Sequence, residues 1–245
     1  MFGLATVIVL VVACFVTATI SGILGMAGGV TLLGVMTALL PAPLVVPLHG
    51  IVQLASNWTR TWAFRKYVRW SIFFAFMGPA VVGVAIAANI WADLELTWFK
   101  AWIGVFILSF LVWRKYKPKL RHPPIWSYGV LGLAAGLLAI FVGATGPFLA
   151  PFFLRDDFEN EEVIATKAVC QTWLHLLKIP AFLALSFDYT PYVPLLVALA
   201  TAVIGGTYFG KHLLSRISKE RFVFWFQLVL GGLAVYLIVS TVATR

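Results

Sequence analysis

The sequence predicts an all-α, polytopic membrane protein made of two inverted repeats. Each repeat is expected to contain a glycine-broken helical hairpin followed by three transmembrane helices. Three observations predict this fold: the composition, the positions of the charged residues, and a pattern of glycine and polar residues that recurs 118 positions later in the chain.

The composition of the 245-residue chain indicates a lipid environment. Hydrophobic residues make up 62% of the chain and charged residues 11%, whereas a soluble domain has about 45–50% apolar and about 25% charged residues. This composition excludes a disordered chain, a collagen-like repeat and a small disulfide-linked secreted module. The net charge of +9 does not indicate nucleic-acid binding, because the basic residues lie between long apolar stretches.

Five stretches contain no Asp, Glu, Lys or Arg, and all are long enough for a membrane helix, which needs about 20 mostly apolar residues. These stretches are 1–59, 70–92, 123–154, 189–210 and 222–244. The first apolar segment lacks the positively charged start of a signal peptide, so we expect it to stay as a membrane segment. The ten predicted segments are 3–24, 29–42, 45–64, 70–91, 97–113, 125–142, 146–154, 163–184, 190–210 and 222–243.

The basic residues predict which loops are cytoplasmic. Three loops, 60–69, 114–121 and 211–221, hold 13 of the 18 Lys and Arg residues, and such clusters remain on the cytoplasmic side. All three can lie there only if 125–154 enters the membrane and returns to the same side. Whether 29–42 and 146–154 cross fully or turn back is left open.

This count of crossings predicts the domain organisation. Each half of the chain makes an odd number of net crossings, so two similar halves are inverted relative to each other, as in many secondary transporters. We predict a first transmembrane repeat at 1–115, a basic cytoplasmic linker at 116–124 and a second repeat at 125–245. The expected location is the inner cell membrane.

Two sets of residues recur at the 118-residue shift. The first set contains the glycine breaks: Gly25, Gly28 and Gly29 fall on Gly143, Gly146 and Pro147. The second set contains polar residues: His49, Gln53, Asn57 and Arg60 fall on Lys167, Gln171, His175 and Lys178. Their spacing of four, four and three places each set within an arc of about 80° on a helix. Each half therefore has one helix with a polar stripe, which must face protein or water.

The chemistry of these residues predicts an anion site. Glycine and an early proline permit helices to begin inside the membrane, and helix starts bind anions through free N–H groups and the positive end of the dipole. No Asp or Glu lies within 45–64 or 163–184, so a cation site is disfavoured. The predicted substrate-binding residues are Gly25, Gly28, Gly29, His49, Gln53, Asn57, Gly143, Thr145, Gly146, Pro147, Lys167, Gln171, His175 and Lys178.

Structural roles remain open for the same residues. Glycines also let membrane helices pack closely, and Gln53 and Gln171 could join helices by hydrogen bonds. Arg60 and Lys178 lie late in their helices and could extend to a membrane interface, and Lys167 could lie at the membrane edge. His49 and His175 could be hydrogen-bonded structural residues or proton-sensitive ligands.

The glycine motifs, SGILGMAGG at 21–29 and GATGPFLAPFFL at 143–154, resemble those of the TauE/SafE family of sulfite and sulfonate exporters. The chain length, the central basic loop and the helix that follows each motif fit as well, so the resemblance covers nearly the whole chain. It implies a permease that moves sulfite, an organosulfonate or a related sulfur-containing anion, usually outward.

We therefore expect a permease whose partners are a small anionic substrate, the lipid bilayer and, as a candidate coupling ion, the proton. No metal or cofactor is expected, because Cys14 and Cys170 are isolated and no CxxC or HExxH motif occurs. No nucleic acid is expected, because the basic residues lie between apolar segments. The alternatives are an anion channel, an intramembrane hydrolase that pairs Ser21 with a histidine, and a haem protein. The exact substrate, the direction of transport and the oligomeric state are not specified by these patterns.

Overall fold

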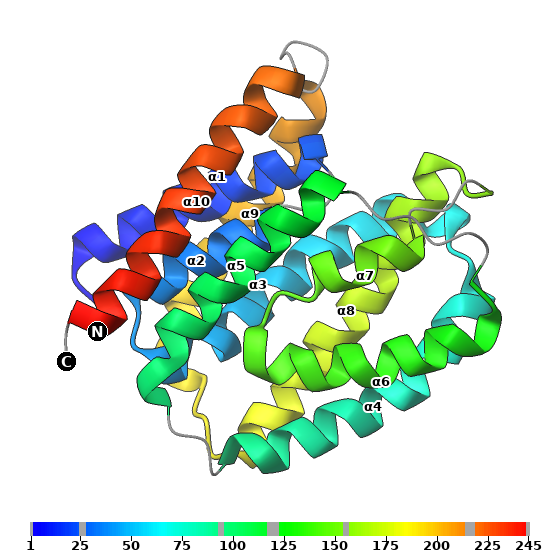
Figure 1. The fold of residues 1–245 in the computed structure, drawn as a ribbon, viewed down its shortest axis with the longest axis horizontal. Coiled ribbons are helices and arrows are strands. Elements are labelled where there is room, and N and C mark those ends of the chain that lie inside the picture. The colour runs from blue at the N-terminus through cyan, green and yellow to red at the C-terminus, as the bar shows by residue number, and fades with distance from the viewer. Residues whose placement is uncertain are drawn as a thin grey trace. The chain divides into compact units, whose positions relative to one another are not determined.

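The computed structural model describes residues 2–24, 28–92, 96–116, 123–153, 157–213 and 219–243. These residues form ten α-helices and three short 3₁₀ turns, and no strand occurs among them (Figure 1). The α-helices are α1 (Leu4–Leu24), α2 (Gly28–Leu39), α3 (Ala42–Ala63), α4 (Trp70–Ala92), α5 (Phe99–Tyr116), α6 (Ile125–Val142), α7 (Gly146–Phe153), α8 (Asn160–Ala184), α9 (Val193–Leu213) and α10 (Lys219–Ala243). The 3₁₀ turns are Arg65–Tyr67, Leu96–Trp98 and Thr190–Tyr192. This arrangement confirms the all-α prediction.

Four of the described helices are long and apolar enough to cross a membrane. Their apolar windows are Leu4–Ser21, Trp70–Ala92, Ile125–Val142 and Thr190–Gly210. Shorter apolar helices occur at Gly28–Leu39, Leu96–Val112 and Leu230–Ala243. The long helices α3 and α8 are less apolar because they carry the two polar stripes. The protein is therefore a polytopic membrane protein.

The helix boundaries follow the 118-residue shift of the sequence motifs. Helices α1 and α6 end 118 residues apart, α2 and α7 begin 118 residues apart, and so do α3 and α8. The breaks therefore occur where glycine recurs in the chain. This spacing supports an internal repeat, and the inverted orientation of its two halves remains a prediction.

The contacts divide the chain into two compact units. The first comprises residues 1–45, 95–117 and 192–245, and so contains α1, α2, α5, α9 and α10. The second comprises residues 46–94 and 118–191, and so contains most of α3 together with α4, α6, α7 and α8. Each unit thus combines helices from both predicted halves of the chain. The boundaries of the two sequence repeats remain a prediction.

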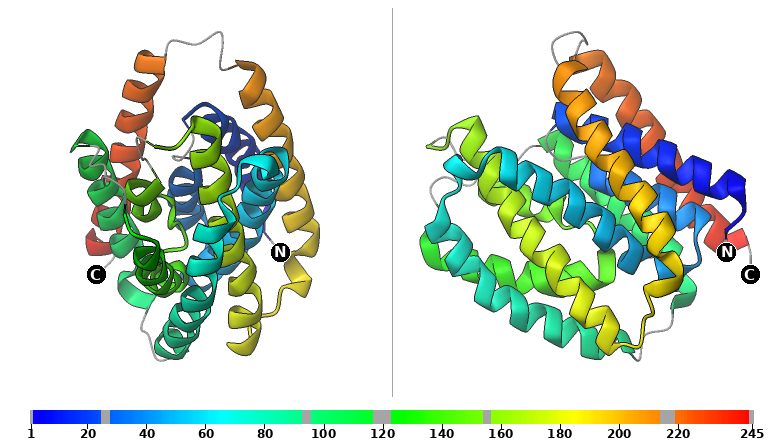
Figure 2. Two further views of the ribbon diagram at one scale, coloured as in Figure 1. Left: turned by 90° about the vertical axis from the view of Figure 1, so that its right-hand side faces the viewer. Right: turned by 180° about the vertical axis from the view of Figure 1, so that it is seen from behind.

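In the first unit, α1 packs closely against α9 (Figure 2). A side chain at Gly206 or Gly210 would meet the backbone carbonyl oxygen of Phe15 or Thr19, respectively. The Thr19 hydroxyl also donates a hydrogen bond to the Gly206 carbonyl oxygen, at 3.1 Å. Small residues and a hydroxyl therefore join these helices, as is typical in membranes.

In the second unit, α4 packs along α6 in the same manner (Figure 1). A Cβ at Gly132 or Gly136 would meet the backbone oxygen of Phe76 or Ala80, so the two backbones are almost in contact. The shift makes α1 equivalent to α6 and α4 roughly equivalent to α9. Both units therefore pair the first helix of one half with the fourth helix of the other, which further supports the internal repeat.

A buried apolar core in the second unit holds α7 and α8 against this helix pair. Phe76, Tyr128 and Phe153 are fully buried in it, and the Tyr128 hydroxyl donates to the Phe152 carbonyl oxygen at 2.9 Å. This hydrogen bond ties α6 to the C-terminal end of α7. The short helix α7 is therefore anchored at its far end, while its first turn lies next to the break that follows α6.

Candidate functional site

The two polar stripes belong to α3 and α8, and both lie in the second unit. Seven of their eight residues are buried, and Arg60 is partly exposed. The buried residues are His49, Gln53, Asn57, Lys167, Gln171, His175 and Lys178. The prediction that these side chains avoid lipid and face protein is thus consistent with their burial.

The stripes approach each other where α3 passes α8. The rings of His49 and His175 lie edge to face, with their centroids 6.2 Å apart. At Gly50, an added Cβ would lie 3.2 Å from the Lys178 Cδ atom. Glycine at position 50 gives the Lys178 side chain room that an added Cβ would reduce. The sequence pattern did not reveal this packing role.

The glycine break between α6 and α7 lies beside these stripes. Helix α6 ends at Val142, and the next residue, Gly143, has a φ of 83°, which is unfavourable for residues with a side chain. Helix α7 begins at Gly146, and Leu149 N–H donates to the Thr145 carbonyl oxygen at 3.1 Å. Because Pro147 has no N–H, Gly146 and Phe148 carry the first amide donors of α7. The predicted helix break and the early proline are both present.

Lys178 connects the stripe of α8 to this break. Its buried ammonium donates a 2.6 Å hydrogen bond to the Gly143 carbonyl oxygen, at the C-terminal end of α6. A cation there is favoured by the negative end of the helix dipole. The bond places a positive charge three residues before α7 begins, so an anion at the start of α7 would have a cationic neighbour.

Several buried polar atoms around the stripes have no hydrogen-bond partner within the described part of the protein. They are Asn57 Oδ1, Arg60 Nε, Thr145 Oγ1 and His175 Nδ1. A buried polar group without a partner costs about 1–3 kcal/mol. These atoms are therefore suited to a polar ligand that enters the protein interior.

Two hydrogen bonds of the α3 stripe are made within its own helix. Asn57 Nδ2 donates to the Gln53 carbonyl oxygen at 2.9 Å, and Arg60 Nη2 donates to Ser56 Oγ at 2.7 Å. Ser56 was not among the predicted residues, although its position four residues before Arg60 on the same helix is a signal for such a contact. Both donors are thus held on α3 itself.

The first glycine break lies in the first unit. Gly28 N–H donates to the Ser21 hydroxyl at 3.1 Å, and a side chain on Gly28 would collide with Thr17 and Ser21. Gly28 is therefore needed for close packing, and Ser21 caps the start of α2, next to Gly29. Gly25 lies outside the described residues.

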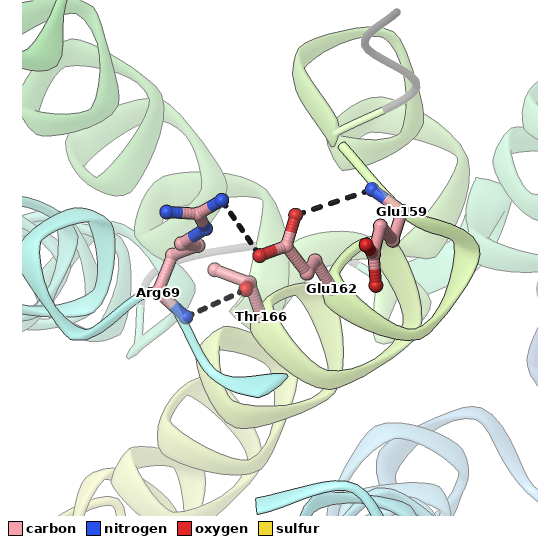
Figure 3. A network of polar contacts seen from close by, with 4 residues as sticks. All are labelled: Arg69, Glu159, Glu162 and Thr166. Carbon is pink, nitrogen blue, oxygen red and sulfur yellow. Dashed lines mark hydrogen bonds and ion pairs between the residues drawn. The ribbon is translucent and has the colours of Figure 1, made fainter. Parts of the chain in front are cut away.

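The start of α8 is fixed by a polar network at its first turn (Figure 3). The Arg69 guanidinium forms a 2.7 Å ion pair with Glu162, and Arg69 N–H donates to the Thr166 hydroxyl at 3.0 Å. Glu162 also accepts a hydrogen bond from Glu159 N–H, which forms a capping box. The hydrogen bond from Arg69 is the main cause that lowers the pKa of Glu162, which precedes the apolar part of α8.

The described residues contain no group of three His, Cys, Asp or Glu side chains that could hold a metal ion. The charged residues within the apolar parts of α3 and α8 are all cationic. The arrangement therefore provides hydrogen-bond donors and positive charge, which suit an anion.

Comparison with known proteins now adds an independent observation. The profile described as sulfite exporter TauE/SafE matches residues 10–237. The chain belongs to the TauE/SafE family. Searches of curated proteins and of solved structures return no significant match. Both glycine breaks and both polar stripes lie within the part of the chain that the TauE/SafE profile covers.

TauE/SafE membership agrees with the architecture of the chain. It indicates a membrane transporter of the sulfite and sulfonate exporter type, with a small anionic substrate, and not an enzyme. The sequence motifs had already indicated this family, and the match confirms it.

Proposed function

We propose that this TauE/SafE protein is a secondary transporter that exports a small sulfur-containing oxyanion, such as sulfite or an organosulfonate. The observation that carries the proposal is the buried Lys178 ammonium, which donates to Gly143 beside the start of α7. It supplies a positive charge next to a helix N-terminus, and the surrounding stripes contain no carboxylate.

In the proposed site, the first-turn amides of α7 bind the anion oxygens at Gly146 and Phe148, where helix starts favour negative charge. The Thr145 hydroxyl, which has no other partner among the described residues, adds a donor at the same break. Gly143 and Pro147 shape the turn that presents these donors.

Side chains of the stripes complete the proposed site. His175, Gln171 and Gln53 offer neutral donors, while Lys178 and Lys167 balance the charge of the substrate. Asn57 offers the substrate an acceptor and not a donor. Its Nδ2 is already bonded to Gln53, and its Oδ1 is a buried acceptor without a partner among the described residues. A substrate with its own donor, such as a protonated oxyanion or an amino sulfonate, would satisfy it.

The proposal is built on the break between α6 and α7. At the other break, the Gly28 amide is already bonded to Ser21, so it is less available to a substrate. A substrate position between the two breaks, with Gly25, Gly28, Gly29 and His49 as further contacts, stays a prediction from the sequence repeat. Proton coupling through His175 is part of the same prediction.

The test is uptake of radiolabelled sulfite into proteoliposomes, with sulfoacetate, taurine, sulfate and chloride as competitors. We expect saturable uptake that at least one sulfur-containing competitor reduces, and that Gln171→Ala weakens. Asn89→Ala is the matched control, since Asn89 is an exposed amide on α4 whose Nδ2 donates to the Ala85 carbonyl oxygen of the same helix.

Two results would contradict the proposal. Correctly folded protein that gives no flux above empty liposomes would remove these anions as substrates. Ohmic current without saturation or exchange would indicate an anion channel in place of a transporter.

A further inference from the structure

An aromatic groove opens on the surface of the second unit, where the C-terminal part of α3 passes α8. Its volume is about 470 Å³, and four tryptophans line it: Trp58, Trp62, Trp70 and Trp173. Three of them are strongly exposed, with 58% of Trp58, 62% of Trp62 and 48% of Trp70 accessible. In a membrane protein, such a surface contacts lipid, and tryptophans gather at the level of the headgroups.

The wall of the groove offers a ligand almost no hydrogen bonds. The hydroxyls of Thr61 and Thr172 lie 3.2 Å apart and bond to each other. The Trp173 indole N–H donates to the Met77 carbonyl oxygen at 3.0 Å. Because these polar groups are already used, the groove favours a hydrocarbon chain over a small polar solute such as the transported anion.

Arg65, which lines the groove, carries a positive charge. The Arg65 guanidinium lies 4.7 Å from the centre of the Trp62 ring, and its Nη1 donates to the Trp62 carbonyl oxygen at 3.0 Å. No ion pair involves Arg65 among the described residues, whereas Arg69, in the same loop, is paired with Glu162. Arginine binds phosphate oxygens in a bidentate manner, so Arg65 is suited to a phosphate group.

A second groove in the same unit provides a contrast. It lies between α4 and α8, has a volume of about 530 Å³, and is lined by apolar and small residues with Asn89 as the main polar one. It has no cationic residue in its lining. A lipid chain at this second groove would have no charged partner for its headgroup among the lining residues. Of these two grooves, it is therefore the aromatic one that can discriminate between headgroups.

We propose that the aromatic groove binds one anionic phospholipid. Its acyl chain lies along Trp58, Trp62 and Trp173, and its phosphate pairs with Arg65. Basic pockets between membrane helices are known to select anionic headgroups. This lipid site is separate from the proposed anion site at the α6–α7 break, and it does not depend on which anion is transported.

The experiment titrates the purified full-length protein with phosphatidylglycerol or phosphatidylcholine of identical acyl chains. Retained lipid is counted by native mass spectrometry. We expect about a fivefold preference for phosphatidylglycerol, which is the effect of one basic residue near a membrane surface. Arg65→Ala should remove this preference, whereas Lys66→Ala, which removes the same charge from a residue outside the groove lining, should keep it.

A second variant tests the acyl chain. Leu176 lines the groove and is 43% exposed, so Leu176→Trp should fill the groove, and retention of both lipids should fall. Equal retention of the two lipids by the wild type would overturn the proposal. Two other results would also overturn it. One is an equal loss of the preference for phosphatidylglycerol in Arg65→Ala and Lys66→Ala. The other is a dimer without bound lipid whose formation Leu176→Trp abolishes.

Discussion

Lys178 is the residue on which the charge of the proposed site depends. Its ammonium is fully buried and donates to the Gly143 carbonyl oxygen at 2.6 Å. Burial of a charge is costly unless the charge is paired and hydrogen-bonded. A methionine would have similar length without that cost, so the charge of Lys178 is better explained by binding than by stability.

We expect Lys178→Met to separate transport from stability. A hydrogen bond to a charged group contributes about 1.5–3 kcal/mol. Loss of the Lys178 ammonium as a charged donor should therefore weaken sulfite uptake by about 10- to 100-fold. The melting temperature should stay unchanged or rise. The checks are proteoliposome flux and thermal unfolding in detergent, with Lys100→Met on α5 as the control. Normal flux in Lys178→Met would show that its charge is not needed.

At the scale of the helices, the closest packing in the second unit occurs between α4 and α6, where glycine allows the backbones to approach. Gly132 and Gly129 lie on the same helix and offer a matched comparison. A Cβ at Gly132 would press on the Phe76 backbone, whereas at Gly129 the nearest atoms are 3.6 and 3.7 Å away, in ordinary contact.

We predict that Gly132→Ala lowers stability by about 1–3 kcal/mol, which is the usual cost of overpacking. Gly129→Ala should be neutral or stabilising by up to about 1 kcal/mol, because alanine has the higher helix propensity. Thermal unfolding of the two variants in the same detergent measures the difference. Equal melting temperatures would show that α4 and α6 do not pack as closely as described.

The first turn of α8 depends on the ion pair between Glu162 and Arg69. Because the pKa of Glu162 is lowered in the folded protein, the pair stabilises the fold above the pKa of a free carboxyl group. This contribution is lost as the pH falls through the lowered pKa. Arg69 is 51% exposed, so the gain should be at most about 1 kcal/mol.

Glu162→Gln should therefore lower the melting temperature at pH 7 slightly and have little effect at pH 3. Glu161→Gln removes a charge from the same helical turn and controls for the helix dipole. We expect the difference between the two variants to shrink on acidification and in high salt. A difference that stays constant with pH would assign the effect of Glu162 to packing.

The sequence predicted the elements well, for a physical reason. Membrane helices must be long and nearly free of charge, so the apolar stretches marked the ten helices, and glycine marked the breaks at Gly28 and Gly146. The stripes were visible because four-residue spacing recurs on one helix face.

The contacts of Lys178 with Gly143 and of Glu162 with Arg69 were not predicted, because they join residues far apart in the chain. Periodicity shows which face of a helix is polar, but it does not identify its neighbour.

For the whole molecule, the grouping of helices into units also could not be inferred from the chain order. The charge pattern suggested two consecutive halves, whereas the contacts place α5, α9 and α10 with α1 and α2. Such an exchange of helices buries the apolar surface of each half against the other half. It would couple the two halves of a transporter mechanically, which is useful if transport requires one half to move against the other.

The inverted orientation of the two halves can be tested through the loops that follow the equivalent helices α3 and α8. Cys14 and Cys170 are both buried, and replacing them by Ser gives a background for single-cysteine reporters. Lys66 and Asp188 are exposed positions in the two loops.

Inverted repeats place these loops on opposite sides, and the basic charge places Lys66 inside. In intact cells, a membrane-impermeant maleimide should label Asp188→Cys at once, but Lys66→Cys only after permeabilisation. Labelling of both from the same side would mean that the halves are parallel.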